Sequence, residues 1–149
     1  GVTVIGGFHS PIEKECLGLL LKGKQPIIIC PARSIAGMRT PLSWREPLNE
    51  GRLLLLSPFG DTQRRVTAET ALGRNALMVG LCRMLLVIHA GSGSKTEQLC
   101  AQAVSFGKPT FTLEGEENSG VISLGAKPVK IEGVMKEWTS LQKVQPRHG

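Results

Sequence analysis

The fold is decided by residues 84–97, which read Met84-Leu85-Leu86-Val87-Ile88-His89-Ala90-Gly91-Ser92-Gly93-Ser94-Lys95-Thr96-Glu97. An apolar run of strand length leads into a glycine-rich turn, and a stretch with helical spacing follows to about residue 106. A strand, a tight loop and a helix in this order are typical of a parallel βα unit.

The same alternation extends in both directions along the 149 residues. Strands are predicted at 2–5, 26–30, 53–56, 84–89, 108–113 and 129–131, and helices at 11–22, 41–49, 67–82, 95–106 and 134–144. The pattern predicts an α/β fold: a Rossmann-like three-layer α/β/α domain with a mainly parallel sheet.

The predicted domain organisation is a Rossmann-fold domain over 2–131, followed by a C-terminal helix and tail over 132–149, with residues 146–149 frayed. A strand begins almost at once, without a lead-in. We therefore expect the domain to be N-terminally incomplete.

Charge and composition narrow the class of ligand. Eighteen Lys and Arg against twelve Asp and Glu give a net charge of +6, which favours anionic partners such as phosphates or nucleic acid. Four Phe, two Trp and no Tyr argue against a surface built from base-stacking platforms. With no apolar stretch near the ~20 residues of a membrane span and no signal peptide, we expect a cytoplasmic protein without membrane contact.

The four cysteines are widely spaced at Cys16, Cys30, Cys82 and Cys100, each in or beside an apolar run. The favoured interpretation is four reduced, mostly buried thiols, with disulfides or metal ligation as the alternatives. Neither a Ser/His/Asp triad nor a metal-ligand spacing is visible, and the sequence predicts no cofactor and no metal.

Ligands of such sheets bind beyond the carboxyl ends of the strands, so the strand-end loops hold the candidate residues. The candidate phosphate-, nucleotide- or DNA-binding residues are Gly6, Gly7, His9, Ser10, Arg33, Arg74, Asn75, Gly91, Ser92, Gly93, Ser94, Lys95 and Thr96. His9 and His89 each end a strand, which alone is a weak catalytic signal.

The loop at 91–97 has two compatible interpretations. Glycines, hydroxyls, a lysine and a helix N-terminus together favour an anion site. The alternative is an ordinary βα turn, with Ser94 as the N-cap and Glu97 completing a capping box. The spacing is not that of a Walker A loop.

Arg74 and Asn75 lie inside the long helix that follows the third strand, with Arg64 and Arg65 before it. The N-terminal half of that helix is expected near the ligand edge. The alternative interpretation is a solvated basic face.

Several blocks resemble the DNA-processing protein A (DprA/Smf) family, in the family's order. They cover residues 2–13, 51–58, 73–83, 107–109 and 118–126, where Gly73-Arg74-Asn75-Ala76-Leu77 is similar to the family's R-R-N motif and Asn118-Ser119-Gly120-Val121-Ile122 to its N-x-L-I motif. The resemblance implies a Rossmann-like domain that binds single-stranded DNA, delivers it to a recombinase, and forms a homodimer. The family also has an earlier strand with a phosphate-binding loop, so the resemblance implies that this chain lacks its leading strand. Gly6-Gly7 and Pro11-Ile12-Glu13 depart from the family's Ser-Gly and Gly-Ile-Asp.

The glycine loop also resembles the LOG-type phosphoribohydrolases, a related group. Gly91-x-Gly93-Ser94-x-x-Glu97 is similar to the LOG signature G-G-x-G-T-x-x-E, and Arg74 and Met78 match a second LOG motif, with Asn75 in place of its Lys. This resemblance implies a catalytic pair, Glu97 and Arg74, acting on a nucleoside 5′-monophosphate.

The function hypothesis is therefore a DprA-like DNA-processing protein that binds single-stranded DNA through phosphate contacts and is linked to DNA uptake and recombination. The alternative is a LOG-like nucleotide-binding domain or a nucleoside 5′-monophosphate phosphoribohydrolase. A scaffold domain without a particular ligand is the third option.

Overall fold

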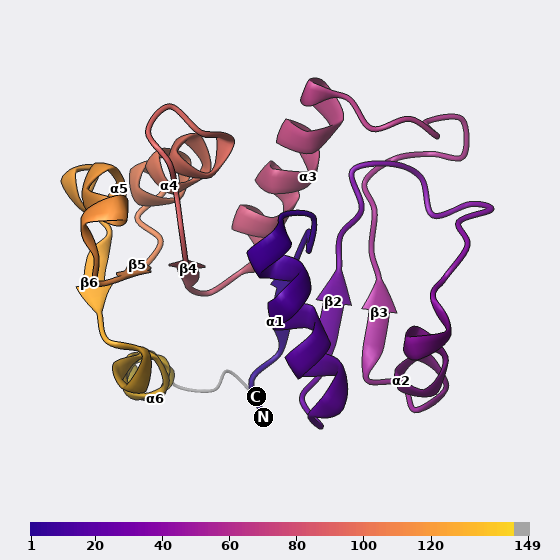
Figure 1. The fold of residues 1–149 in the computed structure, drawn as a ribbon, viewed down its shortest axis with the longest axis horizontal. Helices are drawn as coiled ribbons and strands as arrows, with labels where there is room; N and C mark the ends of the chain where they lie inside the picture. The colour runs from indigo at the N-terminus through magenta and orange to yellow at the C-terminus, as the bar shows by residue number, and fades with distance from the viewer. Residues whose placement is uncertain (145–149) are drawn as a thin grey trace. The chain divides into compact units, whose positions relative to one another are not determined.

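The computed structural model describes residues 1–144 and divides the chain into two compact units, Gly1–Leu81 and Cys82–Gly149. The predicted fraying of residues 146–149 lies outside the described residues. Figure 1 gives the element labels used below.

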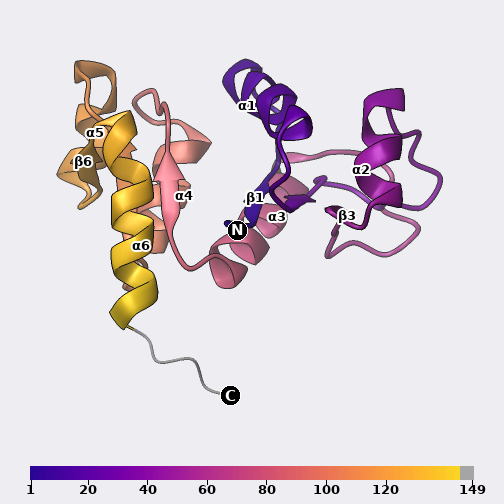
Figure 2. The same ribbon diagram turned by 90° about the horizontal axis from the view of Figure 1, so that it is seen from below.

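The first unit is a three-stranded parallel sheet in the order β1-β2-β3. Its elements are β1 (Val4–Gly6), α1 (Pro11–Lys22), β2 (Ile27–Ile29), the 3-10 turn η1 (Leu42–Trp44), α2 (Arg45–Asn49), β3 (Leu53–Leu55) and α3 (Ala68–Leu81). In Figure 2, α1 and α3 lie on opposite sides of β1, so both faces of this strand are covered.

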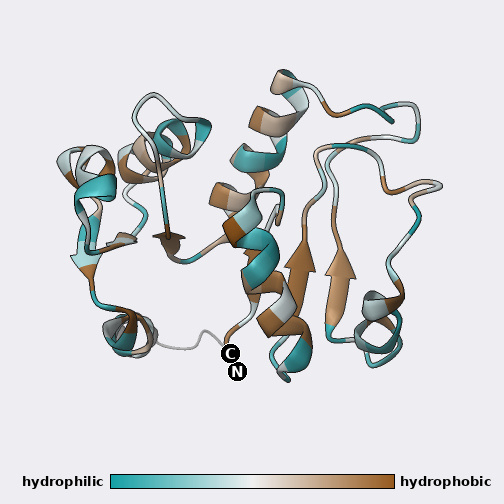
Figure 3. Cartoon of the chain, viewed as in Figure 1, coloured by the Kyte–Doolittle hydropathy of each residue, from teal (hydrophilic) through white to brown (hydrophobic). Residues whose placement is uncertain are grey.

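The core of the first unit forms where α1 packs on the sheet. Leu17 is buried against Ile27, Ile29 and Leu53, with Trp44 and other half-buried apolar side chains around them. Figure 3 shows β2 and β3 as continuous apolar strands, the pattern expected of parallel strands. This packing fixes the carboxyl ends of the three strands at one edge of the unit.

The second unit repeats the plan with a parallel sheet in the order β4-β5-β6. Its elements are β4 (Leu85–Val87), α4 (Lys95–Ser105), β5 (Thr110–Leu113), η2 (Glu116–Asn118), α5 (Ser119–Ser123), β6 (Lys127–Val129), η3 (Ile131–Gly133) and α6 (Val134–Val144). Its core contains Val87, Ala90, Cys100, Val121 and Ala126.

The predicted fold class is confirmed: each unit has the strand order of one βαβαβ half of a doubly wound domain. Two details differ from the prediction. The strands form two hydrogen-bonded sheets within the described chain, where one sheet was expected. The last strand spans Lys127–Val129 and not the predicted 129–131, and Ile131 lies beyond it in a turn with 70% of its surface exposed.

Two cysteines, Cys30 and Cys100, are fully buried free thiols, and Cys16 and Cys82 are half-buried. Burial raises the pKa of both buried thiols, although the charge of Arg74 acts in the opposite direction on Cys30. The structure therefore agrees with reduced, structural cysteines. Within residues 1–144, no helix is long and apolar enough to cross a bilayer.

Candidate functional site

The loops after β2 and β3 are joined by hydrogen bonds at the carboxyl edge of the first unit. Ser57 Oγ donates to the carbonyl oxygen of Arg33 over 2.7 Å, and the backbone N–H of Ser34 donates to the carbonyl oxygen of Gln63 over 2.7 Å. Ser34 is itself buried. These bonds hold the two loops together. We call three arginines of these loops together with the arginine of α3 the arginine edge: Arg33, Arg64, Arg65 and Arg74.

Arg74 reaches this edge from α3. Its Nη1 donates to the carbonyl oxygen of Cys30 over 3.2 Å, directly after β2, and its Nε donates to Asn75 Oδ1 over 2.7 Å. Within residues 1–144 the guanidinium has no ion-pair partner. Its known acceptors are neutral, so the positive charge is not cancelled by a direct salt bridge.

Burial lowers the pKa of the Arg74 guanidinium, while the negative charges of the Glu13 carboxylate and of the ionised Cys30 thiolate raise it. The arginine stays charged at neutral pH because its ordinary pKa lies far above 7. A half-buried cation without a salt bridge is the kind of group that an anionic ligand can satisfy.

The absence of a side chain at Gly7 is what lets the guanidinium lie against the end of β1. A Cβ atom at this position would overlap Arg74 Nη1 and lie 2.7 Å from its Cζ. Gly6 makes similar room for Phe8, whose ring would come within 2.9 Å of a Cβ there. Phe8 has φ of 48°, a left-handed conformation that is strained for a bulky residue.

His9 and Ser10, both predicted as binding residues, form the start of α1. One carboxylate oxygen of Glu13 accepts from Ser10 N–H and Ser10 Oγ at 2.9 Å each and from His9 N–H at 3.2 Å, while Ser10 Oγ accepts from Glu13 N–H at 3.4 Å. This complete capping box was missed in the sequence, although the S-x-x-E spacing of residues 10–13 could have indicated it. The His9 imidazole is exposed.

Of the other predicted binding residues in this unit, Arg33 is half-buried and Asn75 is only 9% exposed. The Asn75 amide orients Arg74 from behind, so its contribution to binding would act through that arginine. Arg64 and Arg65 are exposed.

The glycine loop of the second unit forms a capped turn. Ser94 Oγ accepts from Glu97 N–H at 3.2 Å, as the capping interpretation predicts. The Glu97 carboxylate reaches one residue further back than predicted and accepts from Gly93 N–H at 2.6 Å. Gly91, Ser92 and Lys95 are exposed and Thr96 is half-buried. The Glu97 carboxylate thus accepts from the Gly93 N–H, a donor that an anion site would use. Anion binding at this loop stays a prediction.

Asn118 anchors the root of this loop, a role that sequence reasoning missed. Its fully buried side chain accepts from Ala90 N–H at 3.1 Å and donates to the carbonyl oxygens of Ile88 at 3.1 Å and Leu113 at 3.0 Å. It therefore ties the ends of β4 and β5 together. Only its place in the N-x-L-I motif singled it out in the sequence.

Two solved structures resemble this chain. The DNA processing protein A of Streptococcus pneumoniae has a TM-score of 0.73 and 20% identity, over 91% of this chain and 51% of that protein. The chain has the fold of DNA-processing protein A. The protein of the same name from Helicobacter pylori has a TM-score of 0.63 and 17% identity, over 97% of this chain and 81% of that one, and is described for its single-stranded DNA binding mode.

The predicted resemblance to DNA-processing protein A is thus confirmed for the fold. The chain spans about half the length of the Streptococcus pneumoniae protein. No protein-family model matches the sequence, and no curated protein does. The relation to the LOG enzymes stays a prediction. The two residues of its predicted catalytic pair lie in different units, Arg74 in the first and Glu97 in the second.

Proposed function

We propose that this chain binds single-stranded DNA through phosphate contacts at the arginine edge and acts as a DprA-like DNA-processing protein in DNA uptake and recombination. The observation that carries the proposal is Arg74, a half-buried guanidinium held by neutral acceptors at the ends of β1 and β2. Support also comes from the shared fold with a protein described as binding single-stranded DNA. A recombinase partner, a homodimer and a cytoplasmic location belong to the same proposal.

Charge favours the first unit as the binding surface. Residues 1–81 contain ten Lys and Arg against six Asp and Glu. In the second unit, the first turn of α4 carries Lys95 and Glu97, and the loop after β5 carries Glu114, Glu116 and Glu117 with no lysine or arginine. An approaching polyanion is therefore drawn to the arginine edge and repelled by the acidic loop after β5.

Phosphate contacts should dominate over base stacking because the chain contains few aromatic residues. Each neutralised phosphate of a single strand adds about 0.7 to the slope of log affinity against log salt. The proposal therefore requires binding that weakens steeply as salt rises.

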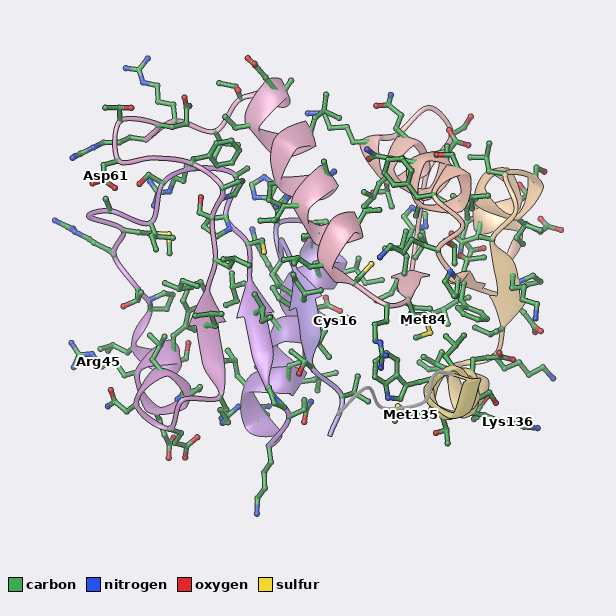
Figure 4. All side chains as sticks on the ribbon, turned by 180° about the vertical axis from the view of Figure 1, so that it is seen from behind. Cys16, Arg45, Asp61, Met84, Met135 and Lys136 are labelled. Atoms are coloured by element: carbon green, nitrogen blue, oxygen red, sulfur yellow. The ribbon has the colours of Figure 1, made fainter. Side chains whose placement is uncertain are left out.

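The test compares two arginines on opposite sides of the first unit. Arg74→Gln removes one positive charge at the carboxyl ends of the strands, and Arg45→Gln removes one positive charge on α2. Figure 4 shows Arg45 at the opposite end of the strands from the loop that contains Asp61. Titrations with a single-stranded oligonucleotide at several salt concentrations should give R74Q a weaker affinity and a slope lower by about 0.7. R45Q should keep both values, and no binding of the unaltered chain at low salt would reject the proposal.

The phosphoribohydrolase alternative has less support. Its carboxylate, Glu97, is already engaged as a helix cap with Gly93 N–H. Base release from AMP by the unaltered chain and by Glu97→Ala tests it directly. A rate above background that is lost in E97A would favour this alternative.

A further inference from the structure

Asn75 is a buried polar residue whose side chain makes one hydrogen bond within residues 1–144, and that bond goes to Arg74. Its Oδ1 accepts from Arg74 Nε over 2.7 Å, while 9% of the residue is exposed. An apolar side chain would occupy this position without the cost of burying an amide. The bond to Arg74 is therefore the feature of the structure that accounts for an asparagine here.

The bond also constrains the path of the arginine side chain. Arg74 and Asn75 are consecutive on α3, and consecutive side chains of a helix do not face each other. The Arg74 side chain must therefore turn across the helix surface to reach the amide. In that position its Nη1 also donates to the Cys30 carbonyl oxygen over 3.2 Å, in space that Gly7 leaves open.

These contacts leave one nitrogen of the guanidinium for a ligand. Nε and Nη1 of Arg74 each donate to a neutral oxygen, whereas Nη2 has no acceptor within residues 1–144. Nη2 is also not enclosed, because the one buried side-chain nitrogen without a partner in this part of the chain is Arg52 Nη1. Arg74 thus offers Nη2 while its other two nitrogens are held.

We propose that Asn75 is a positioning residue, whose amide oxygen fixes the Arg74 side chain so that Nη2 faces the anionic ligand. The identity of that ligand, a phosphate of single-stranded DNA, rests on the proposed function. A flexible arginine loses rotamer freedom when a ligand fixes it, and fixing it beforehand lowers this cost of binding. A neutral amide does so without cancelling the positive charge of the guanidinium, as a carboxylate at the same place would.

The first experiment reads the orientation of Arg74 without DNA. The Nε–H signals of the arginines are recorded by NMR, and the Arg74 signal is identified by its loss in Arg74→Gln. We expect this proton to exchange with water about tenfold more slowly than the Nε–H of the exposed Arg45. The slow exchange should be lost in Asn75→Ala and kept in Asn49→Ala, a control on the exposed surface of α2.

Fast exchange of this proton in the unaltered chain would overturn the inference, and so would slow exchange in N75A. The measurement on the unaltered chain needs no variant of Asn75, so the inference can be refuted even if N75A does not fold.

The second experiment is a double-mutant cycle in oligonucleotide binding. N75A is measured in the unaltered chain and in the R74Q background, with N49A as the control. We expect N75A to weaken binding about fivefold when Arg74 is present and less than about twofold in R74Q, because Asn75 acts through that arginine. Equal losses in both backgrounds are the result of a direct contact with the ligand or of a purely structural role, and they would overturn the inference.

The two experiments separate this inference from the proposed function. If the unaltered chain binds no oligonucleotide while its Arg74 Nε–H exchanges slowly and N75A loses that protection, DNA binding fails and the positioning of Arg74 by Asn75 stands. If the unaltered chain and N75A bind DNA equally well, DNA binding stands and the positioning role fails.

Discussion

Gly7→Ala tests the placement of Arg74 with a single added methyl group. The new Cβ would lie 2.7 Å from Arg74 Cζ and overlap Nη1, so the guanidinium must leave its position. The backbone at Gly7 does not need a left-handed conformation, since this residue is not among the positive-φ glycines. Any effect therefore comes from the displaced arginine and not from backbone strain.

The size of the effect follows from the contacts that are lost. Displacement breaks the 3.2 Å bond from Nη1 to the Cys30 carbonyl oxygen, and a hydrogen bond from a charged group contributes about 1.5–3 kcal/mol. Replacing glycine by alanine returns about 0.4–1 kcal/mol by restricting the unfolded chain. We expect a net destabilisation of about 1–2 kcal/mol and, if Arg74 contacts a phosphate, about tenfold weaker DNA binding.

The assay is denaturant unfolding together with oligonucleotide titration, and Gly18→Ala is the matched control. Gly18 lies on the exposed side of α1 with open space around its Cα, so alanine there should stabilise the helix by about 0.5–1 kcal/mol and leave binding unchanged. If Gly7→Ala is also stabilising and binds DNA normally, the described position of Arg74 is refuted.

Three further predictions concern stability. Asn118→Ala should cost about 2–5 kcal/mol in the free energy of unfolding, because it leaves one buried N–H and two carbonyl groups without their partner; a loss below 1 kcal/mol would contradict this. Burial raises the pKa of Cys30 and Cys100 above the ordinary 9.0, so above that pH the folded chain holds more protons than the unfolded chain and stability falls. The melting temperature should therefore drop as the pH rises above about 9. The drop should be smaller when both cysteines are replaced by alanine, and equal drops in the two proteins would count against this prediction. Arg52→Ala should lower the free energy of unfolding by about 1–2 kcal/mol, because Arg52 Nη2 donates to the last turn of α1 over 2.8 Å. Glu50→Gln, which removes only the ion pair with Arg52, should lower it by under about 1 kcal/mol. Equal losses in denaturant unfolding would refute this difference.

The alternation of apolar and amphipathic stretches predicted the fold class and most elements because local periodicity reports directly on burial. Pro11 and Gly23 marked both ends of α1, and Ser94 marked the start of α4. The last strand was misplaced because Ile131 resembles a strand residue in sequence and yet lies exposed in a turn. A single apolar residue does not report whether its neighbours bury it.

The candidate site was less predictable because its contacts join residues far apart in the chain. Arg74 was found as a charge, but nothing local shows that its guanidinium meets the Cys30 carbonyl group, 44 residues away. Asn118 stands in a polar acidic stretch, where asparagine is expected to be exposed. The Glu13 cap did have a local signal, in its spacing from Ser10. Nothing local indicates that Gly120, which has no side chain, leaves the space that the Glu97 carboxylate occupies.

The hydrogen bonds around Ala90 also set how fast neighbouring amide protons exchange with solvent. Ala90 is 3% exposed, and its amide is bonded to the fully buried Asn118 side chain, so we expect its exchange to require a large opening of the second unit. Three residues later, the Gly93 amide is held only by an exposed contact with Glu97 and exchanges through small local fluctuations. Deuterium uptake should therefore change from slow at Ala90 to fast at Gly93. Such a gradient would mean that the loop is rigid where it leaves β4 and adjustable at its tip.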